Sequence, residues 1–253
     1  MKHRINILVF SVAIVATCLF LSEHTYFYTI LIVLGLTFFL ILSAGVLFMK
    51  FNYFLQNVTR LKSDLVLLTF DDGPHPEFTP KILDILDRHK VKAIFFVVGS
   101  KLSANPDITQ RIIEDGHIIG NHSQDHNPLM SMFSKARLLK EITSAQETIA
   151  ESIKVKPSIF RPPIGYTNPN YAAVLKSLNM KCIGWTLRSY DSVYKTPNKL
   201  IKRLVNNTKP GNIVLLHDNL KVTASSLDTF IAQAKSNGII FASSENIKNI
   251  LDD

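Results

Sequence analysis

Short apolar runs alternate with amphipathic stretches throughout the part of the chain that follows residue 64. We predict strands at about residues 65–70, 93–98, 117–120, 158–160, 181–185, 212–216 and 238–241. A helical pattern follows each run, and the longest helix is predicted over residues 135–153, where apolar side chains recur at helical spacing. Runs that are apolar throughout suit strands buried on both faces, as in parallel sheets covered by helices. The alternation therefore predicts an α/β fold.

The polar residues of interest fall directly after these predicted strands. The carboxyl ends of parallel strands form one rim, which is where (β/α) barrels carry their active sites. This placement favours a distorted (β/α) barrel of about seven units, with an open doubly wound sheet as the alternative.

Two long uncharged apolar segments precede this domain, at residues 5–22 and 26–49. Each is long enough to cross a bilayer core of about 30 Å as a helix. Lys2 and Arg4 would suit a signal peptide, but the second segment follows almost at once and no small-residue cleavage site is evident. We therefore predict a retained two-helix transmembrane hairpin at residues 1–50, a multi-pass location in a bacterial-type cell membrane, and contact with membrane lipids.

The hairpin leaves an interfacial linker at residues 51–63 and a single domain at residues 64–253. Basic residues flank the hairpin, whereas its turn holds only Glu23 as a charged residue. This excess of positive charge predicts a cytoplasmic domain, although cleavage after the first segment would place the domain outside. The side of the membrane therefore stays open.

The formal net charge of +8 is spread over predicted helix surfaces, without a basic tract or interleaved aromatic residues. Such a distribution fits solvated helix faces beside an anionic membrane, and we expect no nucleic-acid partner. Cys18 and Cys182 both lie in apolar stretches, which argues against a disulfide framework or a thiolate metal site.

Two carboxylates and two histidines follow the first and third predicted strands. Asp71 and Asp72 precede a Gly-Pro pair, which on its own would fit a simple turn. His122 and His126 are predicted to share one helical turn and to point the same way, although two exposed loop histidines are the alternative. Together with Asp72 they offer two nitrogens and one oxygen, which leaves positions open for water and substrate. A catalytic zinc, or a related divalent transition metal, requires such a set.

Four motifs, each at the end of a predicted strand, resemble the ordered motifs of the polysaccharide deacetylases (NodB homology, carbohydrate esterase family four). They are TFDDGP at residues 69–74, HSQDH at 122–126, RPP at 161–163 and LLH at 215–217, and the similarity covers about residues 64–241. The resemblance implies a distorted (β/α) barrel. It also implies metal-dependent removal of an acetyl group from an N-acetylated sugar.

The resemblance implies that Asp72, His122 and His126 are the metal ligands and that Asp71 is the general base. The electrostatics agree, because a coordinated carboxylate is held ionised while its neighbour can accept a proton from the attacking water. We expect Arg161 to hold and orient Asp71 through a bidentate pair, with a surface salt bridge as the alternative.

The resemblance also assigns roles to the last two motif regions. It implies that the Ile164 amide stabilises the oxyanion and that His217 is the general acid, oriented by Asp191. Three positions depart from the family pattern. Ile164 stands where Tyr is frequent, Arg188 where an acid is frequent, and Ser192 where a second Trp is usual.

These inferences predict a metal-dependent hydrolase that removes N-acetyl groups from a cell-wall or surface glycan. One alternative keeps the chemistry but acts on a lipid-linked sugar at the membrane surface. Another is a catalytically silent sugar-binding protein. A binding role alone would not require the five intact polar residues Asp71, Asp72, His122, His126 and His217.

Overall fold

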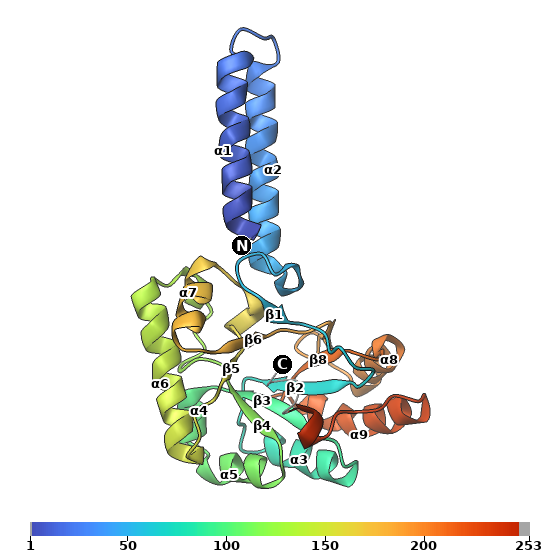
Figure 1. The fold of residues 1–253 in the computed structure, drawn as a ribbon. Helices are drawn as coiled ribbons and strands as arrows, with labels where there is room; N and C mark the ends of the chain where they lie inside the picture. Colours follow the sequence, from blue (N-terminus) through green and yellow to red (C-terminus); the bar gives the residue numbers. More distant parts are fainter. Residues whose placement is uncertain (1, 248–253) are drawn as a thin grey trace.

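The computed structural model describes residues 2–247 and consists of a long helical hairpin that projects from a rounded α/β domain (Figure 1). The hairpin is formed by α1 (Lys2–Phe20) and α2 (Phe27–Leu47). Both helices are long and apolar enough to cross a membrane, and only 6% of each apolar window is buried. They are therefore not core helices, and by length and composition they could be a membrane anchor or a signal sequence.

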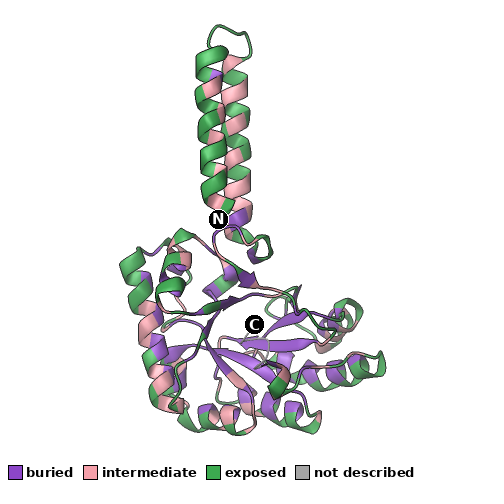
Figure 2. Ribbon diagram, in the orientation of Figure 1, coloured by how far each residue is buried: buried purple, intermediate pink, exposed green. Residues whose placement is uncertain are grey.

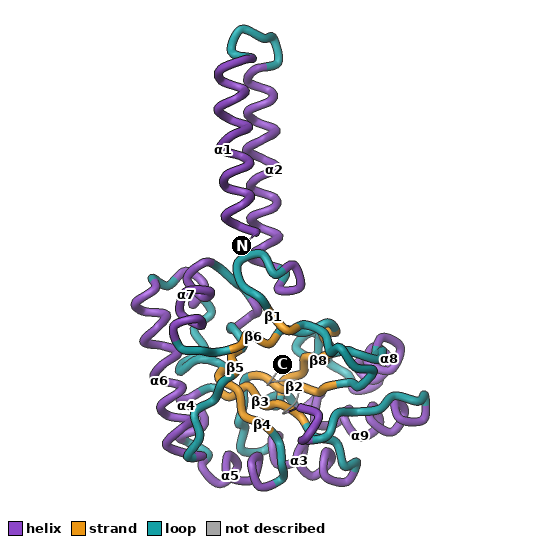
Figure 3. Tube along the Cα trace, viewed as in Figure 1, coloured by secondary structure: helices purple, strands orange, loops and turns teal. Residues whose placement is uncertain are grey.

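The domain is built on one curled sheet of eight parallel strands in the order β1-β6-β5-β4-β3-β2-β8-β7 (Figures 1 and 3). The strands are β1 (Asn57–Val58), β2 (Leu67–Asp71), β3 (Ala93–Val97), β4 (Ile118–Asn121), β5 (Ile159–Phe160), β6 (Lys181–Ile183), β7 (Leu187–Arg188) and β8 (Ile213–His217). No strand pair joins β1 to β7 within residues 2–247, so the sheet is a half-barrel. The predicted α/β barrel-type fold is confirmed.

Helices cover the outer face of this sheet. They are α3 (Phe78–Arg88), α4 (Gly99–Ser103), α5 (Pro106–Glu114), α6 (Lys135–Ile153), α7 (Pro169–Ser177), α8 (Pro197–Asn207) and α9 (Lys221–Ser236). The largest core cluster lies between the central strands and α3, α8 and α9, and includes Phe70, Phe95 and Phe230. Figure 2 shows the strands buried along most of their length and the helices exposed on their outer sides. This is the pattern that continuous apolar strands require.

The last predicted strand, at residues 238–241, is wrong: the segment makes only an isolated bridge between Phe241 and Val66. From Leu67 onward β2 is flanked by β8, and from Leu68 onward also by β3, so no edge is left for further pairing. The helix predicted after this segment begins at Ser244, and its remainder lies outside the described residues.

The segment predicted as a linker contributes to the sheet. Asn57 and Val58 form β1, which pairs in parallel with Cys182 and Ile183 of β6. This pairing ties the chain directly after the hairpin to the edge of the half-barrel.

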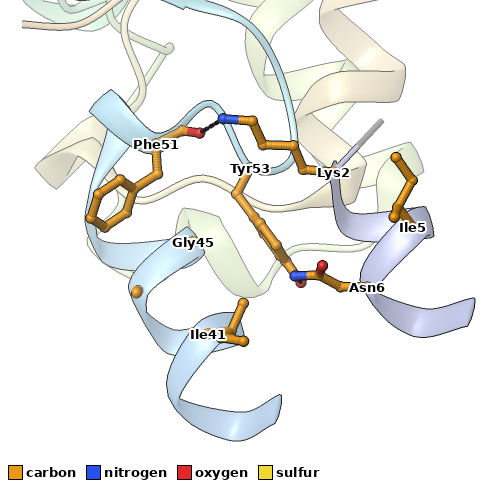
Figure 4. A pocket seen from close by; sticks show the side chains of 8 residues that line it. Lys2, Ile5, Asn6, Ile41, Gly45, Phe51 and Tyr53 are labelled. Carbon is orange, nitrogen blue, oxygen red and sulfur yellow. Dashed lines mark hydrogen bonds between the residues drawn. The ribbon is translucent and has the colours of Figure 1, made fainter. Parts of the chain in front are cut away.

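The lower end of the hairpin is fixed to the domain by hydrogen bonds. The last carbonyls of a helix lack partners within the helix. Here Thr167 supplies two donors, its Oγ1 to the Gly45 carbonyl and its N–H to the Val46 carbonyl, both at 3.1 Å. Tyr53 packs between the two helices, close to Gly45 and Asn6 (Figure 4), and a side chain at Gly45 would collide with its ring. The hairpin is therefore held in a defined position relative to the half-barrel.

Candidate metal centre and active site

A cavity of about 150 Å³ opens at the carboxyl ends of the central strands. Its walls include six of the predicted site residues, namely Asp71, Asp72, His122, His126, Ile164 and His217. The other two, Arg161 and Asp191, are buried directly behind it, against Asp71 and His217. The structure thus gathers all eight residues at one rim.

Asp72, His122 and His126 form a group that fits a divalent metal. Asp72 Oδ1 lies 3.0 Å from His126 Nε2 and 3.4 Å from His122 Nε2, and the candidate ligand atoms all lie within 4.8 Å of one another. Burial opposes ionisation of Asp72, but hydrogen bonds with the two histidines and their charge lower its pKa well below the usual range. Two imidazoles and an ionised carboxylate suit zinc or a related transition metal with open coordination positions.

The two histidines meet through a loop, so the predicted helical turn is wrong. Ser123 and His126 have positive φ values of 75° and 52°, which no α-helix contains. The loop is held by the Ser123 N–H donating to Asn121 Oδ1 at 2.8 Å and by the His126 N–H donating to Ser123 Oγ at 3.0 Å. The imidazole of His122 is oriented separately, because its Nδ1 contacts the Arg161 carbonyl at 2.7 Å and Nε2 is left to face the site.

Asp71 divides its two oxygens between a partner and the cavity. Oδ1 accepts a hydrogen bond from Arg161 Nη1 at 2.7 Å. Oδ2 lies 3.8 Å from His122 Nε2, beyond hydrogen-bond distance. One oxygen is thus anchored and the other is available to accept a proton.

The predicted bidentate pair between Arg161 and Asp71 is wrong, since only Nη1 reaches the carboxylate. Arg161 is completely buried, so each of its N–H groups needs an acceptor. Nε donates to the Ile183 carbonyl at 3.0 Å, Nη2 to the Gly184 carbonyl at 2.8 Å, and Nη1 also to Thr69 Oγ1 at 2.8 Å. The guanidinium is thereby fixed by the end of β6 and holds Asp71 in turn.

The predicted pair between His217 and Asp191 is present. His217 Nδ1 lies 2.7 Å from Asp191 Oδ1, and Asp191 Oδ2 accepts hydrogen bonds from the His217 N–H and from Thr223 Oγ1, both at 2.8 Å. Burial opposes the charged imidazole, but the hydrogen bond and charge of Asp191 outweigh it and raise the pKa of His217 to about 9. The imidazole is therefore a proton donor at neutral pH, with Nε2 free of Asp191.

Ile164 lies in a short 3₁₀ turn, Pro163–Gly165, with φ 63° and ψ −16°. Positive φ is strained for a β-branched residue and is typical of constrained functional turns. Gly165 follows with φ 84°, and a side chain there would collide with the Trp185 ring. No hydrogen bond from the Ile164 N–H is found within residues 2–247, so this donor remains available at the cavity.

Sequence reasoning missed two buried residues that support the site. Thr69 Oγ1 accepts from Arg161 and donates to the Val214 carbonyl at 2.7 Å. The sequence does contain an indication of this role. Thr69 is a polar residue in an apolar strand, and it lies two positions before Asp71, so both side chains are on the same face of the strand.

The second missed residue, Asp218, is only 1% exposed. It accepts a hydrogen bond from Thr79 Oγ1 at 2.6 Å and lies so close to Gly73 that any side chain there would collide with it. Burial raises its pKa to about 7. Asp218 therefore supports the loop that carries Asp72, and its adjacency to His217 at a strand end gave no sign of this role.

A family model and the similar proteins all indicate the same family for this chain. The family model described as polysaccharide deacetylase matches residues 59–183, a range that includes the first three motifs. The chain is 36% identical over 182 residues to the peptidoglycan-N-acetylglucosamine deacetylase PgdA of Listeria monocytogenes, covering 72% of this chain but only 38% of that protein. It is 31% identical over 182 residues to a peptidoglycan-N-acetylglucosamine deacetylase of Bacillus cereus, covering 70% of this chain and 84% of the relative.

Solved structures show the same similarity. The Bc1960 peptidoglycan N-acetylglucosamine deacetylase aligns with a TM-score of 0.71 at 29% identity, covering 78% of this chain and 92% of that chain. BA3943 of Bacillus anthracis, described as a CE4 family pseudoenzyme, aligns with a TM-score of 0.70 at 29% identity, covering 78% and 69% of the two chains. Because a protein named a deacetylase and one described as a pseudoenzyme share this fold, the function depends on the residues of the site.

Proposed function

The chain belongs to the polysaccharide deacetylase family, and from that membership we propose that it removes the acetyl group from an N-acetylated sugar of a cell-wall or surface glycan. The observation that carries this proposal is the convergence of a metal-type ligand set, a carboxylate and a charged imidazole on one cavity. Two relatives are peptidoglycan-N-acetylglucosamine deacetylases by name, which supports this substrate class.

Asp72, His122 and His126 would hold the divalent cation, zinc or a related metal. Such a cation polarises the acetamide carbonyl and lowers the pKa of water. Asp71 Oδ2 accepts the proton of the attacking water, since its Oδ1 is held by Arg161. The Ile164 N–H donates to the carbonyl oxygen as negative charge develops there.

His217 completes the reaction by donating its Nε2 proton to the nitrogen that leaves, so that acetate and a free amino sugar are formed. Asp191 acts through His217 by fixing its orientation and keeping it protonated. Base and acid are thereby separate groups, each held by its own partner, Arg161 for Asp71 and Asp191 for His217.

Acetate release from N-acetylglucosamine oligomers by the metal-loaded full chain tests this proposal. Asp71→Asn should retain the metal and lose turnover by about 10²–10⁴-fold, because the proton acceptor is gone. His126→Ala should lower metal affinity by at least about 100-fold, since even residues behind the ligands contribute about 10–100-fold. An Asp71→Asn variant with normal turnover would contradict this mechanism. A wild-type protein that binds no metal and releases no acetate would leave only the catalytically silent sugar-binding role.

We also infer that residues 1–50 anchor the enzyme in the membrane and that the catalytic domain, predicted from residue 64, includes β1 as its edge strand. Deacylation of a lipid-linked sugar is the second candidate function. It is favoured by a cavity that borders both the metal site and the end of α2. A topology reporter fused to the C-terminus distinguishes the two sides of the membrane, since an external signal favours cell-wall glycan and a cytoplasmic signal favours a precursor.

A further inference from the structure

A second cavity, of about 300 Å³, adjoins the metal site and shares Trp185 and Arg188 with it as wall residues. On the other side it is bounded by Leu47 at the end of α2 and by the turn that follows, which includes Lys50. This volume is at the lower end of the range for ligand pockets, about 300–1,000 Å³. A ligand in this cavity would lie between the end of α2 and the metal site.

The walls of this cavity carry three cations and no acid. Arg188, Arg203 and Lys50 all border it, and none of them forms an ion pair with a carboxylate in the described part of the chain. The guanidinium carbons of Arg188 and Arg203 lie 5.4 and 4.5 Å from the ring centre of Tyr190, so two like charges are held beside one aromatic ring. Keeping such charges together is unfavourable, and an anion between them would offset the repulsion.

The two arginines retain unused donors. Arg203 directs Nε and Nη2 to the Arg188 carbonyl, at 3.1 and 2.8 Å, which fixes the guanidinium and leaves Nη1 available. The Arg188 guanidinium makes no hydrogen bond to the described residues. Arginine forks match phosphate geometry, and they are the side chains of choice where a phosphate is bound bidentately.

The lining of the cavity also includes three apolar residues at and after the end of α2, namely Leu47, Phe48 and Met49. A cavity lined by both cations and apolar side chains suits a ligand that joins a phosphate to a hydrocarbon chain. The hydrogen bonds from Thr167 to the end of α2 keep these apolar residues in a fixed relation to the two arginines.

We propose that this cavity binds the phosphate group of a lipid-linked N-acetylated sugar through Arg188 and Arg203, so that the sugar enters the metal site from the membrane surface. The inference rests on the proposed deacetylase function and names the substrate class of the same site. Lys50, in the turn that follows α2, adds a third positive charge to the lining of this cavity.

The test compares three substrates for the full chain in nanodiscs of phosphatidylcholine. They are a polyprenyl-diphosphate-linked N-acetylglucosamine, soluble N-acetylglucosamine 1-phosphate, and the neutral N-acetylglucosamine tetramer. The readout is the ratio of kcat/KM for the lipid-linked sugar to kcat/KM for the tetramer. Arg203→Gln should lower this ratio by at least about tenfold, mainly through KM, because a charge-assisted hydrogen bond is lost. Arg203→Lys should restore part of it by returning the charge.

Lys202→Gln is the matched control, since Lys202 is an exposed cation on the same helix and borders neither cavity. It should leave the ratio within about twofold. A ratio that Arg203→Gln does not change would overturn the phosphate site, while tetramer deacetylation would still support the proposed function. If Arg203→Gln weakens binding to phosphatidylglycerol vesicles but leaves the ratio unchanged, the arginine contacts membrane lipid instead of the substrate. This result would also overturn the phosphate site.

If Arg203→Gln lowers kcat/KM only for soluble N-acetylglucosamine 1-phosphate, the cavity binds phosphate but not the lipid-linked sugar. This result would overturn the lipid-linked part of the proposal. Failure of the metal-loaded wild-type protein on all three substrates would instead overturn the proposed function itself. The two ideas are therefore tested by different results of one experiment.

Discussion

Asp71 and Asp72 are adjacent in the chain, yet their carboxylates face different partners. Asp71 is the last residue of β2, whereas Asp72 has a positive φ of 73°. This change of backbone conformation, which aspartate tolerates better than most residues, turns Asp72 toward the histidines and leaves Asp71 facing Arg161. Two identical side chains can therefore serve as ligand and as base.

The proposed acid gives a prediction for the pH profile. Asp191 raises the pKa of His217 from its usual 6.5 to about 9, so His217 should remain a donor until the pH rises through that range. Asp191→Asn removes the charge that stabilises the imidazolium. The alkaline limb of kcat/KM should then move down by about one pH unit or more.

The pair of His217 and Asp191 also stabilises the fold, and this stabilisation, like the activity, is lost at alkaline pH. Because the folded pKa of His217 is raised, the contribution is complete below pH 6.5 and is lost as the pH rises through about 9. Thermal unfolding of the wild type and of Asp191→Asn should therefore differ most at acid to neutral pH. If the alkaline limb of kcat/KM lies at the same pH in both proteins, Asp191 does not determine the pKa of His217.

At the scale of elements, the proposed groups come from the ends of several different strands. Asp71 follows from β2, His122 from β4, Arg161 from β5 and His217 from β8, and the parallel register of the sheet brings these ends to one rim. The sheet thus supplies the positions, and the loops supply the directions of the side chains.

The loop between β2 and α3 gives a second prediction, through Asp218. Its pKa is raised to about 7 by burial, so the folded state binds its proton more tightly than the unfolded state, where the value is near 3.8. Stability from this group is complete below the unfolded pKa and is lost as the pH rises to about 7.

Asp218→Asn keeps an acceptor for Thr79 Oγ1 and removes the ionisable group. The metal-free variant should be more stable than the metal-free wild type at pH 8, by more than about 1 kcal/mol, and similar to it at pH 4. Denaturant unfolding at both pH values measures this. Equal stability of the two proteins at pH 8 would mean that the carboxylate is ionised without cost.

The sequence was informative where side-chain pattern alone determines structure. The spacing over residues 135–153 predicted α6 with both of its bounds, and the ordered motifs predicted which residues meet at the rim. The two-residue strands β1 and β7 carry no periodicity and were missed. The loop at Ser123 and the divided hydrogen bonds of Arg161 depend on backbone acceptors contributed by distant segments, which a local pattern does not contain.

At the scale of the whole molecule, the hairpin and the half-barrel behave as one unit because several contacts join them. Thr167 bonds to the end of α2, and Asn57 Nδ2 donates to the Met49 carbonyl at 2.9 Å. Since β1 contains Asn57 and pairs with β6, the sheet itself is connected to the base of the hairpin (Figure 1). A membrane anchor mounted in this way would present the cationic cavity at a constant height above the lipid.

Gly45→Leu tests whether that mounting matters. A side chain at residue 45 would collide with the Tyr53 ring and force the hairpin away from the domain. Gly35→Leu is the control on the same helix, because no atom lies within 4 Å of a side chain built there. In nanodiscs, Gly45→Leu should lower kcat/KM for a polyprenyl-diphosphate-linked N-acetylglucosamine by about tenfold or more relative to the soluble tetramer, whereas Gly35→Leu should leave the ratio unchanged. Equal ratios in both variants would mean that the substrate reaches the metal site independently of the hairpin, because only the side chain at residue 45 meets the Tyr53 ring.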